Sequence, residues 1–316
     1  MRTRSANVFL KPTAHEGGYL PEGPREMTVS GKKVLVWVNI QDGANASSGT
    51  IFARGFEDTR DVLSIPCPGR PGFILPVRGG DRALVGVEKE LRLCNLATET
   101  WSDPLARIPD DNPRTIINDA EIVPGGKAVV FGTKDTLFKE QIANLYLFTV
   151  ADNRVSLLAD KQLCSNGKVF HADERGLILF DIDTPTRKVV RYRLDLSART
   201  ATPDGVALDL AKQVGFPDGM CDSGYGTVIV AFYNPEFAEA GRAVRFSVST
   251  GEAIDEWLTP GSPRVTCPFV DGKGLILTTA IEGMPAEMLS RCPNAGCLFV
   301  ADAELAKLPV SEVVRL

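Results

Sequence analysis

The chain has 316 residues, of which 44% are apolar and 24% charged, a composition typical of a globular protein with a sizeable core. Its formal net charge of −5 and its pI near 5.3 argue against a binder of nucleic acid or of an anionic membrane surface. No apolar run approaches the roughly 20 residues that span a bilayer, and the N-terminal stretch lacks the apolar core of a signal peptide, so we expect a cytoplasmic protein.

The seven cysteines fit that location. They are odd in number and scattered, and no two have the CxxC spacing. Cys292 and Cys297 are close enough in sequence to form a disulfide or half of a zinc site, but no second pair and no histidine cluster completes such a site. We therefore expect all seven cysteines to be reduced packing residues.

Six segments share one pattern, in which a short strand, a turn containing glycine and a second, more apolar strand follow one another. In chain order they span residues 27–39, 73–87, 121–132, 168–180, 220–232 and 267–280. The second strands begin at intervals of 45 to 51 residues. A further alternating strand follows most of these hairpins, as in "NLYLFTV" and "KVVRYRLD". The repeating unit therefore has about four strands in ~48 residues, which is the size of a propeller blade.

Helical periodicity is nearly absent, and residues 285–291 make at most one or two turns. An α/β fold needs long amphipathic helices, and neither a β-sandwich nor a β-helix explains the repeat length. We predict an all-β fold, a six-bladed β-propeller with four-stranded antiparallel blades, as a single domain over residues 1–316. The N-terminal "NVFLKP" and the C-terminal "SEVVRL" are expected to share a blade and close the ring.

Four oxygen-bearing side chains occupy nearly the same phase of four repeats. They are Glu22, Asn118, Asn166 and Asp218, each 10 to 12 residues before the second strand of its hairpin. Asn166 and its following glycine precede a strand where no tight turn is needed, although Asn-Gly is a strong turn signal. The first strand of a propeller blade lines the central channel, so the four side chains are expected to converge on the axis. Taken singly, each remains compatible with an ordinary turn or strand break.

Converging carboxylates repel one another and lose hydration, so a cation is expected to compensate them. Two carboxylates and two amide oxygens form an all-oxygen site for a hard divalent cation, which favours Ca²⁺, Mg²⁺ or Mn²⁺ over Zn²⁺. We predict one divalent ion, with Ca²⁺ preferred and Mg²⁺, Mn²⁺ or Zn²⁺ as alternatives. The glycine after three of these residues is expected to let the backbone turn sharply toward the ion.

With these motifs in place, nearly the whole chain resembles the SMP-30/gluconolactonase/regucalcin-like family. The resemblance rests on "PEGP" (21–24), "WVNI" (37–40), "INDAEIVPGGKAVVFGTKD" (117–135), "SNG" (165–167), "DTPTRKVVRY" (183–192) and "FPDGM" (216–220), in this order and spacing. It implies a six-bladed propeller with a divalent metal in its channel and, in many members, hydrolysis of lactones. By this resemblance Glu22, Asn166 and Asp218 match the metal ligands. Asn118 matches a position that binds metal in some relatives and contacts substrate in others.

Two positions depart from the family pattern. Sugar lactonases often carry an arginine two residues before the position of Asn118, where this chain has Ile116. Arg114 lies two residues further back and is a candidate to bind a substrate hydroxyl or carboxylate, with a surface salt bridge as the alternative. The aromatic residue usual after the "EGP" motif is replaced by Arg25-Glu26. Both departures are expected at the pocket mouth, so the substrate is not expected to follow from that of the standard sugar lactonases.

The predicted reaction is metal-assisted opening of a lactone ring, in which the cation polarises the carbonyl and a water attacks it. Asp218 is the candidate general base, because a ligand carboxylate also accepts a proton from that water. A serine triad is disfavoured, since there is no G-x-S-x-G motif, His15 is expected on the surface and His171 in a turn far from the ligands.

Two alternatives stay open. One is a metal-dependent phosphoesterase or diisopropylfluorophosphatase-like hydrolase, and the other is a non-enzymatic calcium-binding propeller. The expected partner is a small-molecule lactone, with neither nucleic acid nor membrane. The sequence does not indicate an oligomeric state.

Overall fold

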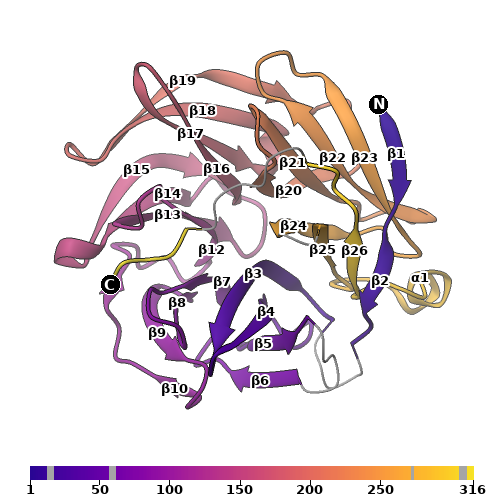
Figure 1. Ribbon diagram of the computed structural model, residues 1–316, viewed down its shortest axis with the longest axis horizontal. Coiled ribbons are helices and arrows are strands. Elements are labelled where there is room, and N and C mark those ends of the chain that lie inside the picture. Colours follow the sequence, from indigo (N-terminus) through magenta and orange to yellow (C-terminus); the bar gives the residue numbers. More distant parts are fainter. Residues whose placement is uncertain (13–17, 57–61, 272–273, 306–311) are drawn as a thin grey trace.

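The computed structural model describes residues 1–12, 18–56, 62–271, 274–305 and 312–316, and it shows six β-sheets arranged in a ring around a central axis (Figure 1). The chain is thus a six-bladed β-propeller, as the repeat predicted. We number the sheets blades 1 to 6 in chain order and give their strands from the channel outward.

Blade 1 contains β3 (Pro21–Val29), β4 (Lys32–Asn39), β5 (Thr50–Gly55) and β6 (Val62–Pro66). Blade 2 contains β7 (Pro71–Pro76), β8 (Arg82–Val87), β9 (Glu90–Asn95) and β10 (Thr100–Trp101), and β11 (Ala106–Arg107) also pairs with β9. Blade 3 contains β12 (Thr115–Ile122), β13 (Ala128–Asp135), β14 (Ala143–Thr149) and β15 (Arg154–Gln162).

Blade 4 contains β16 (Ser165–Asp173), β17 (Gly176–Asp183), β18 (Lys188–Asp195) and β19 (Thr200–Asp209). Blade 5 contains β20 (Phe216–Asp222), β21 (Thr227–Tyr233), β22 (Ala240–Ser247) and β23 (Ala253–Pro260), with β1 (Arg2–Ser5) added in parallel to β23. Blade 6 contains β24 (Val265–Asp271), β25 (Gly274–Thr279), β26 (Leu298–Ala301) and β2 (Asn7–Leu10). The helical segments are η1 (Val150–Asp152), η2 (Thr184–Thr186) and α1 (Ala286–Arg291).

The six predicted hairpins are the two innermost strands of the six blades. Neighbouring blades pack face to face through apolar layers, so both faces of an inner strand are covered and every residue of β13 is buried. Between blades 2 and 3, the ring centroids of Phe73 and Phe131 lie 6.2 Å apart, and those of Phe131 and Tyr146 lie 5.6 Å apart. Such strands appear in the sequence as continuous apolar runs rather than as alternating ones.

Ring closure follows the prediction at the N-terminus only. β2 pairs antiparallel with β26, so the N-terminal strand supplies the outer edge of blade 6. The expectation that "SEVVRL" joins the same blade is wrong for its described residues. Val314 instead pairs in parallel with Val77 and is fully buried against blades 2 and 3. The reason is that β2 already occupies the free edge of β26.

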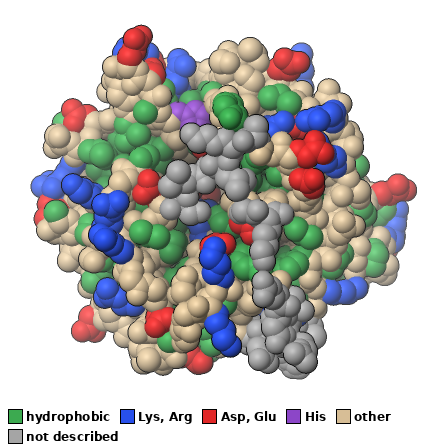
Figure 2. Space-filling model, in the orientation of Figure 1, with side chains coloured by type: hydrophobic (Ala, Val, Ile, Leu, Met, Phe, Trp, Pro, Cys, Tyr) green, Lys and Arg blue, Asp and Glu red, His purple; other side chains and the backbone are tan. Residues whose placement is uncertain are grey.

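Acidic and basic side chains are interspersed over the described part of the face in Figure 2. All seven cysteines lie in described residues, are buried and form no disulfide, as predicted. Within the described residues, no helix has the length and apolarity needed to cross a membrane.

Candidate metal centre and active-site cavity

The innermost strand of every blade shifts its register near the same end of the channel. The shifts fall at 22–25, 71–73, 117–120, 165–168, 217–220 and 265–268 in blades 1 to 6. A β-bulge leaves residues unpaired and re-aims their side chains. Glu22, Asn118, Asn166 and Asp218 all lie within or beside these bulges. This answers the question raised by Asn-Gly at position 166, because the pair forms a bulge in a channel strand and not a hairpin turn.

The glycines at two bulges serve a steric purpose that differs from the predicted sharp turn. Neither Gly167 nor Gly219 has a positive φ. A Cβ at Gly167 would lie 2.4 Å from the backbone nitrogen of Met220, and one at Gly219 would lie 2.8 Å from the Cα of Cys267. Each glycine therefore lets the inner strand of one blade approach the inner strand of the next. Gly23, with φ of 55°, fits the original expectation.

The structure brings the four predicted ligands together around one cavity of about 650 Å³ at this end of the channel. Glu22 and Asp218 are both buried, with 8% of each residue exposed. Glu22 accepts a hydrogen bond from the backbone N–H of Gly23 at 3.1 Å. Within the described residues, the carboxylate of Asp218 receives none. Two buried carboxylates with a single donor between them are unstable without a cation.

The two asparagine side chains are oriented by the cavity wall. The Nδ2 of Asn118 donates to the carbonyl of Ser165 and to the Oδ1 of Asn166, both at 3.0 Å. The Nδ2 of Asn166 donates to the Oγ1 of Thr184 at 2.8 Å, and that hydroxyl donates to the carbonyl of Pro217 at 2.9 Å. Both amide nitrogens are thus used by the protein. The Oδ1 of Asn118 accepts no hydrogen bond from the described residues.

A fully buried ion pair holds the bulge that carries Asn166. The side chains of Lys168 and Asp181 are 0% and 1% exposed, and the Nζ and Oδ1 atoms lie 3.2 Å apart. The same ammonium donates to the Oγ of Ser165 at 3.0 Å and to the backbone carbonyl of Asn166 at 2.5 Å. The sequence analysis did not identify this pair, although it fixes the backbone of a predicted ligand.

Burial raises the pKa of both Glu22 and Asp218 well above the usual range, and for Glu22 the repulsion by Asp218 adds to that rise. A divalent cation fits this set of oxygen donors, because carboxylates and amide oxygens are its ordinary ligands. Among the described residues, no group of three or more His, Cys, Asp or Glu side chains is arranged to hold a metal. A metal here therefore depends on the asparagine oxygens as well as on the two carboxylates.

Six further polar side chains among the described residues line the same cavity and were not predicted as site residues. They are Lys134, Thr136, Thr184, Tyr233, Arg264 and Glu282. They come from second strands, loops and η2, where no shared phase in the repeat marks them.

Arg114 is not among the described residues that line this cavity. Its Nε lies 3.0 Å from the Oδ1 of Asp135, and its Nη1 lies 2.6 Å from the Oε1 of Glu140. Asp135 also accepts the backbone N–H groups of Leu137, Lys139 and Glu140. Arg114 therefore supports the loop beside the cavity, and its guanidinium is engaged in the salt bridge named above as the alternative.

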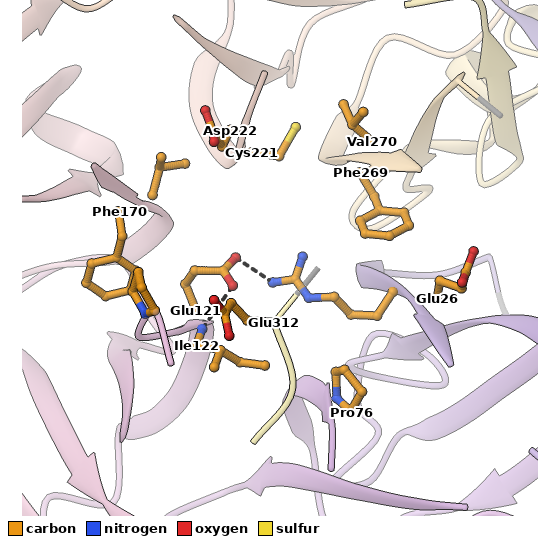
Figure 3. A pocket seen from close by; sticks show the side chains of 13 residues that line it. Glu26, Pro76, Glu121, Ile122, Phe170, Cys221, Asp222, Phe269, Val270 and Glu312 are labelled. Carbon is orange, nitrogen blue, oxygen red and sulfur yellow. Dashed lines mark hydrogen bonds and ion pairs between the residues drawn. The ribbon is translucent and has the colours of Figure 1, made fainter. Parts of the chain in front are cut away.

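A second cavity, of about 260 Å³, lies at the other end of the inner strands, lined by residues that follow the bulges along each strand (Figure 3). Here Arg25 pairs with Glu121 at 3.0 Å, so its expected position at the mouth of the ligand cavity is wrong. His171 lies at this end too, in β16 rather than in a turn, with its Nε2 3.2 Å from the Oδ1 of Asp222. His15 lies outside the described residues.

The fold and the site together define a six-bladed propeller with an oxygen-lined cavity at one end of its channel. The chain belongs to the SMP-30/Gluconolactonase/LRE-like family, whose model matches residues 20–281. Regucalcin of Danio rerio is 28% identical over 193 residues, which cover 60% of this chain and 63% of that relative, less than two thirds of its length.

Two solved structures share the fold. The calcium-binding protein regucalcin of Agrobacterium tumefaciens superposes with a TM-score of 0.81 at 21% identity, over 100% of this chain and 99% of that one. A luciferin-regenerating enzyme gives a TM-score of 0.80 at 19% identity, over 99% of this chain and 100% of that one.

Proposed function

We propose that this protein is a divalent-metal-dependent hydrolase that opens a lactone ring at the 650 Å³ cavity. The observation that carries the proposal is the pair of buried carboxylates, Glu22 and Asp218, which line one cavity and receive a single hydrogen bond between them from the described residues. Membership of a family that includes gluconolactonases supports the reaction type. We further propose a cytoplasmic location, which the seven unpaired cysteines support.

Glu22, Asp218 and the Oδ1 of Asn166 would hold the ion, and the Oδ1 of Asn118 would bind the ion or the substrate. When bound, a divalent cation supplies Lewis-acid polarisation of the lactone carbonyl and stabilises the charge that develops on its oxygen. Asp218, whose carboxylate receives no hydrogen bond from the described residues, would accept a proton from the attacking water. The pair of Lys168 and Asp181 keeps Asn166 at its position by fixing its backbone.

The phosphoesterase alternative receives no support from a histidine, since none of the described residues lining this cavity is one. The non-enzymatic alternative draws on the structural neighbour described as a calcium-binding protein. We retain it as an outcome of the test below.

The test is lactone hydrolysis by chelator-stripped protein with Ca²⁺, Mg²⁺, Mn²⁺ or Zn²⁺ added back, followed as proton release. The panel combines aldono-1,4- and 1,5-lactones with simple γ-lactones, and wild type is compared with Asp218→Ala. Activity that returns with metal and disappears in the variant supports the proposal. If metal raises the melting temperature while no lactone is opened, the enzyme proposal fails and the calcium-binding propeller replaces it.

A further inference from the structure

Lys134 presents an unpaired ammonium to the ligand cavity. The residue lies in β13, only 7% of it is exposed, and it lines the same cavity as the four candidate ligands. Within the part of the chain that the structure describes, its Nζ makes no hydrogen bond and no ion pair. A buried ammonium without a partner carries a large desolvation penalty, so its position calls for an anionic ligand.

Two other buried cations near the channel already have partners for at least part of their side chains. Lys168 has three oxygen partners, including the carboxylate of Asp181. Arg264 donates to the carbonyl of Pro235 at 2.9 Å and lies 5.4 Å from the ring centroid of Tyr233. Arg264 has no ion pair among the described residues, but its guanidinium is engaged by that carbonyl and that ring. The Nζ of Lys134 has neither kind of partner there, and it lines the cavity that a substrate would occupy.

The three carboxylates among the described residues of the cavity, those of Glu22, Asp218 and Glu282, form no ion pair with Lys134. Lys134 lowers the pKa of Glu22 and of Asp218 through space, but it forms no ion pair with either. With a divalent cation bound, both carboxylates would be neutralised by the metal. The charge of Lys134 would then remain uncompensated at the wall of the cavity.

Much of the remaining wall is apolar. Leu20, Ile40, Leu163, Pro185 and Phe216 line the cavity together with Phe138, which is 51% exposed. A polyhydroxylated sugar would leave many hydroxyl groups against these side chains without partners, which is costly. A compact ring with one charged substituent matches both the apolar wall and the ammonium of Lys134, which has no partner among the described residues.

We propose that Lys134 binds a carboxylate group on the substrate, so that the preferred substrate is a small anionic lactone and not a neutral sugar lactone. The substrate class rests on the lactonase function proposed above, whereas the anion site itself does not. The ammonium would donate hydrogen bonds to the carboxylate and fix which ring carbonyl faces the candidate ligands. Charge-assisted hydrogen bonds of this kind contribute about 1.5–3 kcal/mol, or roughly 10- to 150-fold in affinity.

A binding test uses two lactams that differ only in charge, 5-oxopyrrolidine-2-carboxylate and its carboxamide, because lactams resist hydrolysis. NMR titration is run on wild type, Lys134→Met and Lys134→Arg, with and without Ca²⁺. We expect the acid to bind wild type at least 10-fold more tightly than the amide, with that preference lost in Lys134→Met and kept in Lys134→Arg. Equal binding of acid and amide by wild type overturns the proposal, and this comparison needs no variant to fold. A preference that survives in Lys134→Met also overturns it.

A turnover test uses the matching lactones, 5-oxotetrahydrofuran-2-carboxylate and its carboxamide, with metal present. We expect kcat/KM to favour the acid by at least 10-fold, with most of the difference in KM, and Lys134→Met to remove that preference. If both lactones are opened at equal rates, the role of Lys134 is refuted and the lactonase function stands. If neither is opened while the lactam acid still binds through Lys134, the anion site stands and the lactonase function fails.

Discussion

Replacing Asp218 by asparagine should have opposite effects on stability in the presence and absence of metal. Without metal, the substitution removes one of two buried carboxylates and leaves an amide of the same shape. Asp218 has no hydrogen-bond donor within the described residues, so no protein bond is lost. We expect a gain of about 1–2 kcal/mol, because a buried charge without partners is replaced by a neutral group.

With metal the sign reverses. An ion at 1,000 times its Kd stabilises the wild type by about 4 kcal/mol, and loss of one of two ligand carboxylates should weaken binding about 100-fold, which leaves about 1.4 kcal/mol. For a chain of 316 residues, unfolding entropy near 2.1 cal/mol/K per residue gives about 1.5 °C per kcal/mol. The metal-induced rise in Tm should therefore fall from about 6 °C to about 2 °C.

The assay is thermal unfolding of both proteins in chelator and in a titration of Ca²⁺, with Asp255→Asn as the matched control. Asp255 is buried in the outer strand β23, where it pairs with Arg2 and Arg4, so its substitution should lower Tm to a similar extent with and without metal. The reasoning is refuted if Asp218→Asn is less stable than wild type in chelator, or if metal stabilises the variant as strongly as the wild type.

Three other substitutions test the supporting structure. Gly167→Ala should lower the free energy of unfolding, measured in urea, by about 2–4 kcal/mol, because its Cβ would lie 2.4 Å from the backbone of the next blade. In the control Gly43→Ala the added Cβ has no atom within 4 Å, so the free energy of unfolding should change by less than about 0.5 kcal/mol. Lys168→Met should destabilise the folded protein by about 3 kcal/mol. It should also weaken metal binding measured by calorimetry, since the carbonyl of Asn166 loses its hydrogen-bond donor. Unchanged metal affinity in the folded variant would contradict the positioning role of Lys168. Asp135 has a pKa held well below its usual range, chiefly by Arg114, so it stabilises the fold above that range and loses this effect as the pH falls through its folded-state value. Urea midpoints of Asp135→Asn should thus be lower than wild type at pH 7, and the difference should begin to narrow only below about pH 4 and narrow further toward pH 2. A pH-independent difference would count against this.

The repeat and the four phase-matched polar residues were predictable because both follow from the geometry of one blade. Each blade has the same inner strand with the same bulge, so equal spacing in the sequence becomes convergence in space. Glu22, Asn118, Asn166 and Asp218 share that register, and their meeting at one cavity needed no long-range information.

The rest of the site depends on facts that the spacing does not contain. Lys134 follows a run of buried residues in the second strand of blade 3, where the sequence does not say that its side chain reaches the channel. Arg114 lies just before β12 begins, so the alternation of that strand does not set the direction of its side chain. Its guanidinium instead pairs with Asp135. The place of Val314 depends on which strand edge β2 leaves free.

The closure of the ring by β2 has a consequence for how the protein is made. Asn7 of β2 pairs with Val300 of β26, so β2 has no partner until the other five blades and then β26 have been translated. Until β2 docks, β26 has an unpaired strand edge, and exposed edges recruit other chains. Joining the ends is a contact of very long sequence separation, which slows folding. Newly synthesised chains should therefore depend on chaperones mainly in the interval between the end of synthesis and the docking of β2.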